Sequence, residues 1–481
     1  MSARALPVAA GAVAALMAGA SWSIAALPVA WHPEHRTLGT VVYYVGLALL
    51  GGSWLVLGRT LLTSTGSAAS RRVAHRFALI AAAPMLAAAP FGRDLWAYAA
   101  QGHLVGTGRD PYHHGPAAAP GRFADEVSAR WLHSPSPYGP LWLRFSQFAA
   151  WASHGHPIVA ALVLRAPAYI GLLLCCWAVG ALAARFGARA DVALWLGSAS
   201  PLMTVLGVGG GHNDLVMLGL ALAGLALAAR PGWSAVAGAA ALASAGALIK
   251  SPAAIVVAFI VPVWLAAGRE PPTVRRAGGA VATALAAAVA TLSALTGLTG
   301  LGFGWVTKVN SDAQWVSWLS LPSAAAIFGK WVSGEGHPRR LDDTVRVCRT
   351  VGELIAVVAL ALLWLLAVRR ARERGTAVGL LALALGVAAV LGPSVQPWYY
   401  LWALTVAGLA VRDRRALLAL AAVPVVFTVM ITPSGKGWES DWRAPLVVLG
   451  GVVVTALALR PGRRSPPLAP EPVAAPPLPG R

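Results

Sequence analysis

The sequence predicts an all-α integral membrane protein, a polytopic helical bundle of about 14 transmembrane helices with two large outer loops that contain juxtamembrane helices. The chain of 481 residues is 57% hydrophobic and only 12% charged, whereas soluble chains contain about 25% charged residues. Its mean hydropathy is +0.66. Apolar runs recur along the chain and are separated by short arginine-rich segments, so we expect most of it to lie in a bilayer.

The net charge of +20 would suit a nucleic-acid-binding protein, but the distribution of the charge argues against that class. Of the 38 basic residues 34 are arginines, and most stand in short clusters at the ends of apolar runs. Such clusters orient membrane spans and form no basic groove, so no nucleic-acid partner is expected. The adjacent Cys175 and Cys176 and the isolated Cys348 predict neither a disulfide framework nor a zinc site.

The predicted spans follow from apolar length and from the position of the arginines. Arginine clusters within 59–76, 185–189, 269–276 and 369–374 mark cytoplasmic loops. The first run resembles a secretory signal, but many comparable runs follow it, and we interpret it as a retained span. The predicted spans are 6–30, 38–57, 77–90, 158–184, 192–208, 215–229, 235–249, 253–267, 277–298, 347–368, 377–391, 398–411, 416–431 and 445–459.

Two long polar segments, 91–156 and 299–346, are assigned to the outer face. Most of the 18 acidic residues fall in these loops or at the edges of outer turns, although they were not used to orient the chain. Within the loops, 141–151 and 317–331 are interpreted as interfacial helices. If 317–331 were a full span, the later arginine clusters would face outward, against the positive-inside bias.

The domain prediction is a single polytopic membrane domain over residues 1–460. Residues 91–156 form its first large outer loop, which is expected to be catalytic, and residues 299–346 form the second. The tail 461–481 is rich in proline and arginine and poor in apolar residues, which predicts a disordered cytoplasmic end.

The ionisable residues gather at one face, and the predicted spans are almost free of charge. Transporters usually carry such residues near the bilayer midplane, because their pathway crosses it. The pattern therefore favours one-sided chemistry at the outer membrane surface. A lipid-linked substrate transporter or flippase remains the alternative from another class.

Polar residues in the first outer loop are candidates for sugar or acceptor contacts, namely Asp110, Tyr112, His113 and Tyr138. Asp110 and Tyr112 belong to a turn-like Gly-Arg-Asp-Pro-Tyr sequence, so Asp110 has either a structural role in the turn or a role in binding a sugar. His113 and His114 beside it are a weak metal signal without a third ligand, and no metal site is assigned.

A glycine-rich turn and a break between two short spans supply further candidates. His212, Asn213 and Asp214 can meet an anion or sugar hydroxyls through imidazole, amide and backbone groups, or Asn213 and Asp214 can cap a helix. Lys250 stands at the outer break, where a phosphate partner or simple snorkelling explains its charge.

The remaining candidates are basic and aromatic side chains. Arg93 and Lys308 are further candidates for binding a phosphate. Gln396, Trp398 and Tyr399 offer a polar group with aromatic faces suited to stacking on a sugar, although an aromatic belt at the membrane interface also explains the rings.

Several motifs resemble, in order along nearly the whole chain, the actinobacterial polyprenol-phosphomannose-dependent alpha-(1→6)-mannopyranosyltransferases of the GT-C class. The first is R-D-L-W-A-Y-A-A-Q-G from Arg93. G-x-D-P-Y and S-P-Y-G-P-L-W follow, the latter with Tyr138. G-H-N-D, a Lys-Pro helical break and Q-P-W-Y-Y-L-W from Gln396 complete the series.

The resemblance implies a GT-C type bundle that transfers mannose, with inversion, from polyprenyl-phosphate mannose to a lipid-anchored alpha-(1→6)-mannan of the lipomannan or lipoarabinomannan type. The family's base, a carboxylate in the first outer loop, matches Asp94. Such a transfer requires a base for the acceptor hydroxyl and cationic groups for the developing phosphate charge. Without the resemblance, Asp94 has the alternatives of pairing with Arg93 or capping a helix.

The resemblance also implies a plasma-membrane location with the site on the extracytoplasmic face. Many GT-C enzymes carry a paired acidic motif for a metal, whereas this chain has Arg93 beside Asp94. No cofactor is therefore assigned, and a divalent metal is not favoured. A related enzyme that uses another polyprenyl-phosphate sugar is the alternative within the class.

Overall fold

A computed structural model describes residues 5–24, 36–90, 93–268, 270, 272–308, 316–335, 341–373, 375–429 and 444–460. The described residues form helices joined by turns and contain no strand, which confirms the predicted all-α class. The predicted disordered tail, 461–481, lies outside the described residues, as do parts of both predicted outer loops.

Five stretches of helix in the described part are long and apolar enough to cross a membrane. A sixth span results if η4 and α10, which meet at a bend of 107°, are counted together. This is fewer than the predicted 14, because many predicted spans form helices of about 15 residues, which are only about 22 Å long. The five stretches are Leu6–Ile24 (α1), Arg36–Thr63 (α2), Pro157–Phe186 (Pro157–Val163, α7, with Ala166–Phe186, α8), Val274–Thr299 (α13) and Asp343–Arg369 (α16).

The other helices are shorter. A 3-10 turn, Ala83–Ala87 (η2), continues α3, and a π-helix, Met203–Gly209 (η4), precedes α10. The remaining elements are Ala68–Ala82 (α3), Asp94–Gly106 (α4), Pro116–Ala118 (η3), Arg122–Asp125 (α5), Pro140–Ala152 (α6), Ala190–Leu196 (α9), Asp214–Ala228 (α10), Trp233–Ala247 (α11), Ala253–Ala267 (α12), Trp305–Lys308 (α14), Leu321–Val332 (α15), Thr376–Leu391 (α17), Pro397–Tyr399 (η5), Tyr400–Ala407 (α18), Arg414–Thr428 (α19) and Ala444–Ala458 (α20).

The centre of the bundle is α10, which packs against α8, α11 and α12. Glycines allow α8 and α10 to approach closely. A Cβ atom on Gly171 of α8 would lie 2.2 Å from the Leu215 backbone, and one on Gly219 of α10 would lie 2.7 Å from the Gly171 carbonyl oxygen. Small residues at such contacts are typical of helix packing within membranes.

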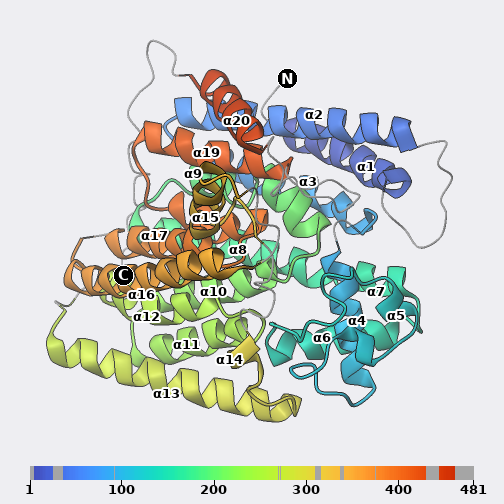
Figure 1. The fold of residues 1–481 in the computed structure, drawn as a ribbon. Helices are drawn as coiled ribbons and strands as arrows, with labels where there is room; N and C mark the ends of the chain where they lie inside the picture. Colours follow the sequence, from blue (N-terminus) through green and yellow to red (C-terminus); the bar gives the residue numbers. More distant parts are fainter. Residues whose placement is uncertain are drawn as a thin grey trace.

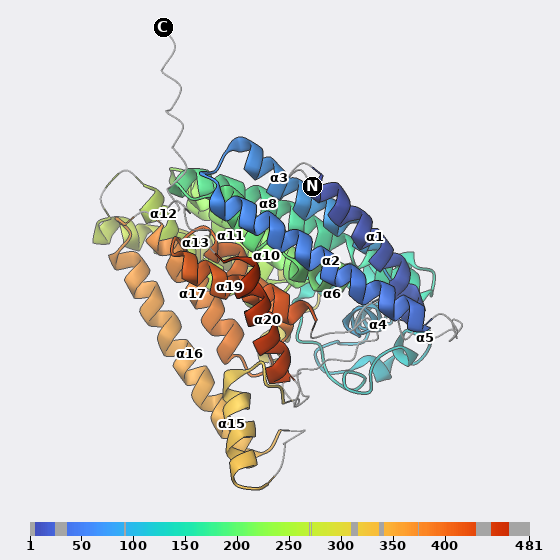
Figure 2. The same ribbon diagram turned by 90° about the horizontal axis from the view of Figure 1, so that it is seen from above.

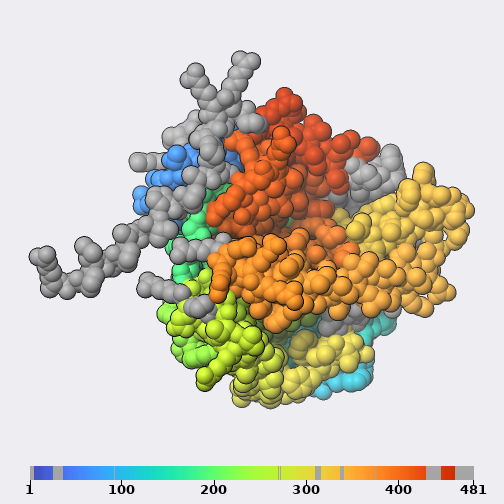
Figure 3. Space-filling view, turned by 90° about the vertical axis from the view of Figure 1, so that its left-hand side faces the viewer, coloured from blue at the N-terminus to red at the C-terminus, as the bar shows by residue number. Residues whose placement is uncertain are grey.

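The long helices at the edge of the bundle present apolar side chains outward. On α16, Leu354, Val357 and Leu362 are all more than half exposed, and Figure 3 shows the face over which this helix lies. Apolar side chains exposed in this number suit contact with lipid rather than water.

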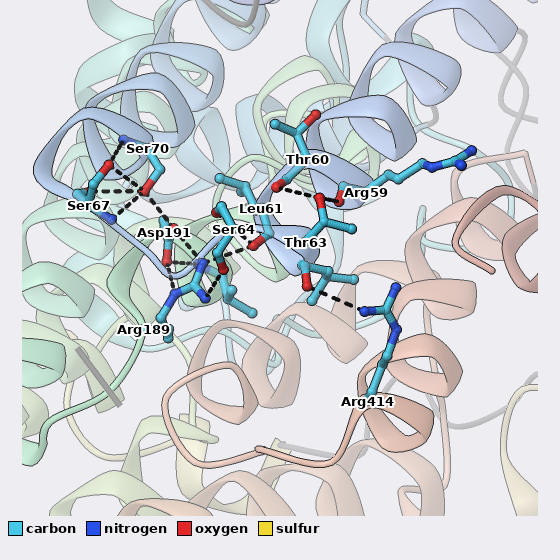
Figure 4. A network of polar contacts seen from close by, with 12 residues as sticks. Arg59, Thr60, Leu61, Thr63, Ser64, Ser67, Ser70, Arg189, Asp191 and Arg414 are labelled. Carbon is cyan, nitrogen blue, oxygen red and sulfur yellow. Dashed lines mark hydrogen bonds and ion pairs between the residues drawn. The ribbon is translucent and has the colours of Figure 1, made fainter. Parts of the chain in front are cut away.

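A buried ion pair joins α9 to the turn between α2 and α3 (Figure 4). The Arg189 guanidinium donates to both carboxylate oxygens of Asp191 at 2.8 Å and to the Leu61 and Ser64 carbonyls at the end of α2. Asp191 also accepts a hydrogen bond from Ser70 in the first turn of α3. The network fixes the end of α3 that lies farther from the site described below.

Helices α4, α5, α6 and α7 form a group on one side of the bundle (Figures 1 and 2). Helix α4 packs tightly on α6, since a Cβ on Gly102 would lie 2.1 Å from the Ser146 carbonyl oxygen. In the second predicted outer loop, α15 has 12 residues. Its length suits the interfacial interpretation of 317–331, because a span needs about 20 residues.

Candidate active site

The first two turns of α4 and three connecting segments line one small pocket. Asp94 is the first residue of α4, and Tyr138 precedes α6. Lys250 stands in the turn between α11 and α12, and Gln396 precedes η5. Trp398 and Tyr399 of η5 complete the predicted residues in the lining.

The segment that carries Tyr138 is held against the Lys250 turn by backbone hydrogen bonds. The Gly139 amide donates to the Ile249 carbonyl at 3.1 Å, and the Leu141 amide donates to the Leu248 carbonyl at 3.1 Å. A Cβ atom on Gly139 would lie only 2.1 Å from that Leu248 oxygen. Glycine is therefore required here for a close backbone approach, and the S-P-Y-G-P motif has a local physical reason.

Asp94 lies beside His212, which comes from the turn between η4 and α10. The Nδ1 atom of His212 lies 3.5 Å from the Oδ2 atom of Asp94. The imidazole is buried and stacks on Trp398, with ring centroids 3.5 Å apart. About a quarter of the Asp94 side chain, 23%, remains exposed. The carboxylate is thus partly accessible, as a general base requires, and its 3.5 Å contact with His212 is longer than a formed hydrogen bond, since His212 Nδ1 has no hydrogen-bond partner among the described residues.

Lys250 is held by a buried carboxylate and surrounded by aromatic rings. Its Nζ atom donates to Asp214 Oδ2 at 2.7 Å, and the other oxygen of Asp214 accepts a hydrogen bond from the Trp402 indole at 2.9 Å. The ammonium also lies 4.4 Å from the centroid of the Tyr399 ring and 6.0 Å from that of Tyr138. A lysine ammonium has three N–H donors, so it retains capacity for a ligand in the pocket.

A second, more apolar pocket adjoins the first. The two pockets share Pro137, Tyr138, Lys250 and Tyr399 in their linings. The rest of the second lining consists of two prolines, Ile255, Ala388, Gly392 and Trp402, together with Ser251 and Ser394. A cation thus stands where a polar pocket meets an apolar one.

Three predicted contact residues of the first outer loop do not line either pocket. Asp110 accepts a hydrogen bond from the Tyr112 amide at 2.7 Å and lies 2.8 Å from His113 Nδ1. Burial alone would raise the pKa of the Asp110 carboxyl, but these two partners lower it below its ordinary value. Tyr112 is buried in a separate cluster with Leu143 and Trp305. Their predicted sugar or acceptor contacts remain untested.

The other predicted residues are either exposed outside the two pockets or buried behind their walls. Arg93 is exposed beside Asp94, and Lys308 ends α14; neither lines the two pockets. Asp214 is buried in its ion pair with Lys250. Asn213 is fully buried, and its side-chain amide has no hydrogen-bond partner within the described residues.

Sequence reasoning missed several residues of the site, among them Gln101 and Trp402. Gln101 lies on the same face of α4 as Asp94, two turns farther along, and lines the pocket. Its side-chain oxygen accepts a hydrogen bond from the Ser136 hydroxyl at 3.1 Å. The spacing of Asp94, Ala97 and Gln101 along a helix could have revealed it. The Trp402 indole donates a hydrogen bond to Asp214. Trp402 stands four residues after Trp398, a spacing that places two side chains on one face of a helix and could have revealed it.

Within the described part of the chain, no three His, Cys, Asp or Glu side chains are grouped so that they could hold a metal ion. The charged residues in the pocket lining are Asp94 and Lys250, and Asp214 lies behind Lys250, bound to its ammonium and to the Trp402 indole.

Comparisons with known proteins agree along the length of the chain. Residues 1–268 match the model of the alpha-(1→6)-mannopyranosyltransferase N-terminal domain, and residues 322–460 match that of the MptB C-terminal domain. Alpha-(1→6)-mannopyranosyltransferase A of Mycobacterium tuberculosis is 32% identical over 84% of this chain and 78% of its own length. The corresponding protein of Corynebacterium glutamicum is 31% identical over 83% of this chain and 84% of its own.

One solved structure was also matched. An archaeal oligosaccharyltransferase from Archaeoglobus fulgidus, in complex with an inhibitory peptide and a dolichol-phosphate, has 12% identity and a TM-score of 0.35 over 80% of this chain and 55% of its own.

The apolar helices and the matches to the mannosyltransferase family models and relatives define a multi-pass membrane glycosyltransferase. The chain belongs to the alpha-(1→6)-mannopyranosyltransferase family, as the motifs predicted.

Proposed function

We propose that this protein transfers mannose from polyprenyl-phosphate mannose to an alpha-(1→6)-mannan chain of the lipomannan or lipoarabinomannan type. The acceptor 6-hydroxyl attacks the anomeric carbon, the bond to the phosphate breaks, and polyprenyl phosphate leaves. Because the proposed transfer inverts and its product is α-linked, the donor is β-linked. The names of the relatives and the pocket around Asp94 support this function.

Asp94 acts as the general base that takes the proton of the acceptor hydroxyl. Its position carries the proposal, because it is a partly exposed carboxylate in the pocket that also contains Lys250. His212 lies beside its Oδ2 atom and orients the carboxylate. Catalytic hydrogen bonds are often long without substrate and shorten in the complex, so a distance of 3.5 Å suits this role.

Lys250 binds the donor phosphate at the junction of the two pockets. The sugar then lies in the polar pocket with Asp94, while the first isoprenoid units occupy the apolar pocket toward Ile255 and Pro393. A charge-assisted hydrogen bond from the ammonium stabilises the negative charge that develops on the leaving phosphate. The proposed assignments of Arg93, His212 and Lys308 to the phosphate have less support from the pocket geometry.

Gln396, Trp398 and Tyr399 contact the sugars. Aromatic faces bind the apolar C–H surface of a hexose, and the Gln396 amide can both donate to and accept from hydroxyl groups. The site lies on the extracytoplasmic face, as inferred from the positions of the arginine clusters relative to Asp94 and Gln396.

The test uses the purified full chain in detergent or vesicles, labelled polyprenyl-phosphate mannose and a short alpha-(1→6)-mannoside. The wild type should lengthen the mannoside. The transfer rate of the D94N variant should be about 10² to 10⁴ times lower than that of the wild type, while the variant still inserts into the membrane. Retained transfer by D94N would remove the base assignment.

The same assay separates the alternatives. Extension with a different polyprenyl-phosphate sugar, and none with mannose, would change the donor. Movement of labelled lipid across a vesicle bilayer without a new glycosidic bond would identify a flippase instead.

A further inference from the structure

Arg165, between α7 and α8, is a fully buried cation outside both pockets. Its side chain donates to backbone carbonyls only. The guanidinium binds the Gly209 oxygen at 2.8 Å and the Ala89 oxygen at 2.6 Å, with further bonds to Leu86 and Ala88. None of the ion pairs found among the described residues includes it.

These carbonyls belong to the two segments that lead into the site. Ala89 follows η2 and stands five residues before Asp94, while Gly209 ends η4 and stands three residues before His212. One side chain therefore joins the backbone that carries the proposed base to the backbone that carries its histidine neighbour.

The junction is tightly packed on the histidine side. Gly211 has a φ of +65°, and a Cβ there would lie 2.6 Å from Leu95 Cδ2 and 3.0 Å from Arg165 Cγ. Leu95 is the neighbour of Asp94 in α4, so the turn before His212 rests directly on both Arg165 and the start of α4. A movement of the guanidinium would be transmitted to both sides.

Arginine has specific chemical reasons to occupy this position. Its rigid planar fork presents five N–H donors and can hold carbonyls from two segments in a fixed geometry, whereas lysine offers one flexible ammonium. The carbonyls at the ends of η2 and η4 have lost their helical partners and require donors. Removing the fork leaves buried acceptors unsatisfied, so the segments shift to find others.

We infer that Arg165 is a positioning residue that sets the distance between Asp94 and His212. This inference rests on the proposed function, because it assigns a catalytic consequence to that distance. A misplacement of about 1 Å at reacting groups can reduce a rate by roughly 10²-fold, although the displaced residue touches no substrate.

The test is a double-mutant cycle with R165K and H212Q in the mannosyl-transfer assay. R165K alone should lower kcat by about 10- to 100-fold and leave the donor KM nearly unchanged, since the donor pocket is intact. In the H212Q background, R165K should lower kcat by less than about threefold, because the histidine that Arg165 positions is already absent. R185K is the control: Arg185 is in the last turn of α8, the helix that begins directly after Arg165, and it also donates to a carbonyl, that of Ala229. It should leave kcat unchanged.

Folded protein is quantified by size-exclusion chromatography before each rate is calculated. Equal losses from R165K in both backgrounds, or an unchanged kcat, would overturn the inference. If R165K does not accumulate, G211A replaces it, since its Cβ disturbs the same junction while the Arg165 side chain is retained, and the same coupling is expected. An inactive wild type would instead refute the proposed function.

Discussion

The imidazole of His212 lies between Asp94 and Trp398: its Nδ1 atom is 3.5 Å from the Asp94 carboxylate and its ring stacks on the indole. Asp94 and His212 fall in the region that matches the family's N-terminal domain, and Trp398 falls in the C-terminal region. The surroundings of the proposed base are therefore completed by a residue from the other end of the chain.

The H212Q variant should lose about 10- to 100-fold in kcat, with a smaller change in donor KM. Glutamine retains a polar group of similar length but loses both the stacked ring and the placement of Nδ1 beside the carboxylate. Loss of one preorganised hydrogen-bond donor that acts directly on the transition state costs about 10² to 10³, and a smaller loss is expected here because His212 acts on the base rather than on the substrate. Steady-state kinetics with labelled donor measure both parameters, and wild-type kcat in H212Q would contradict the assigned orienting role.

Removing both partners of the Lys250–Asp214 ion pair should restore the stability that either single substitution loses, but it should not restore activity. D214N alone leaves a mostly buried ammonium without its counter-charge, and K250M alone leaves a buried carboxylate, so each should lower the free energy of unfolding by about 3 to 5 kcal/mol. The double variant D214N/K250M should recover most of that stability, because no unpaired charge remains.

Activity should not recover in that double variant, since the proposed phosphate-binding ammonium is absent. Thermal unfolding in detergent and the transfer assay, applied to the same preparations, separate the two effects. Restored transfer in D214N/K250M would exclude Lys250 as a phosphate ligand.

The G139A variant should reduce transfer by at least tenfold while the bundle remains folded. The added Cβ would lie 2.1 Å from the Leu248 carbonyl oxygen, so the backbone pairing that places Tyr138 near Lys250 must open. G329A on α15 is the matched control, because a Cβ at that glycine meets nothing within 4 Å. Equal activities of the two variants would contradict the importance of this pairing.

The Asp110 turn should contribute stability that depends on pH. Hydrogen bonds lower the pKa of this carboxyl relative to the unfolded chain, so the charged form is favoured by folding. The contribution is present above the ordinary Asp pKa of about 4 and is lost as the pH falls through the lower folded value. Its size is small, because the side chain is 47% exposed. The difference in Tm between wild type and D110N should therefore shrink on acidification, and a difference independent of pH would contradict this.

The fold class and several site residues were predictable because membrane sequences carry strong one-dimensional signals. Apolar length and low charge identified the helical membrane class, and residues with unusual polarity, such as Lys250 and Asp94, stood out against that background. The number of spans was not predictable, since a run of 15 apolar residues gives the same signal whether its helix crosses a bilayer or stops within the bundle.

The side-chain contacts within the site could not be predicted from the sequence either. Nothing in the composition of the G-H-N-D turn indicates that Asp214 binds Lys250 or that His212 stacks on Trp398, because these contacts depend on how four separate turns are brought together. Tyr112 shows the opposite case: its motif resembles a binding loop, but its ring packs in an apolar cluster with Leu143 and Trp305. Arg165 was not predicted as a functional residue, since it lies inside the predicted span 158–184 and no motif of the sequence marks it.

The carboxylate of Asp214 has consequences for the order in which the nascent chain matures. Its first oxygen gains a partner once Lys250 has left the ribosome, but its second oxygen waits for the Trp402 indole, 188 residues after Asp214. The pocket wall of Gln396, Trp398 and Tyr399 arrives at the same late stage. A ribosome-bound or truncated chain thus contains the proposed base and cation without a closed pocket, and we expect the proposed transfer only when synthesis is nearly complete.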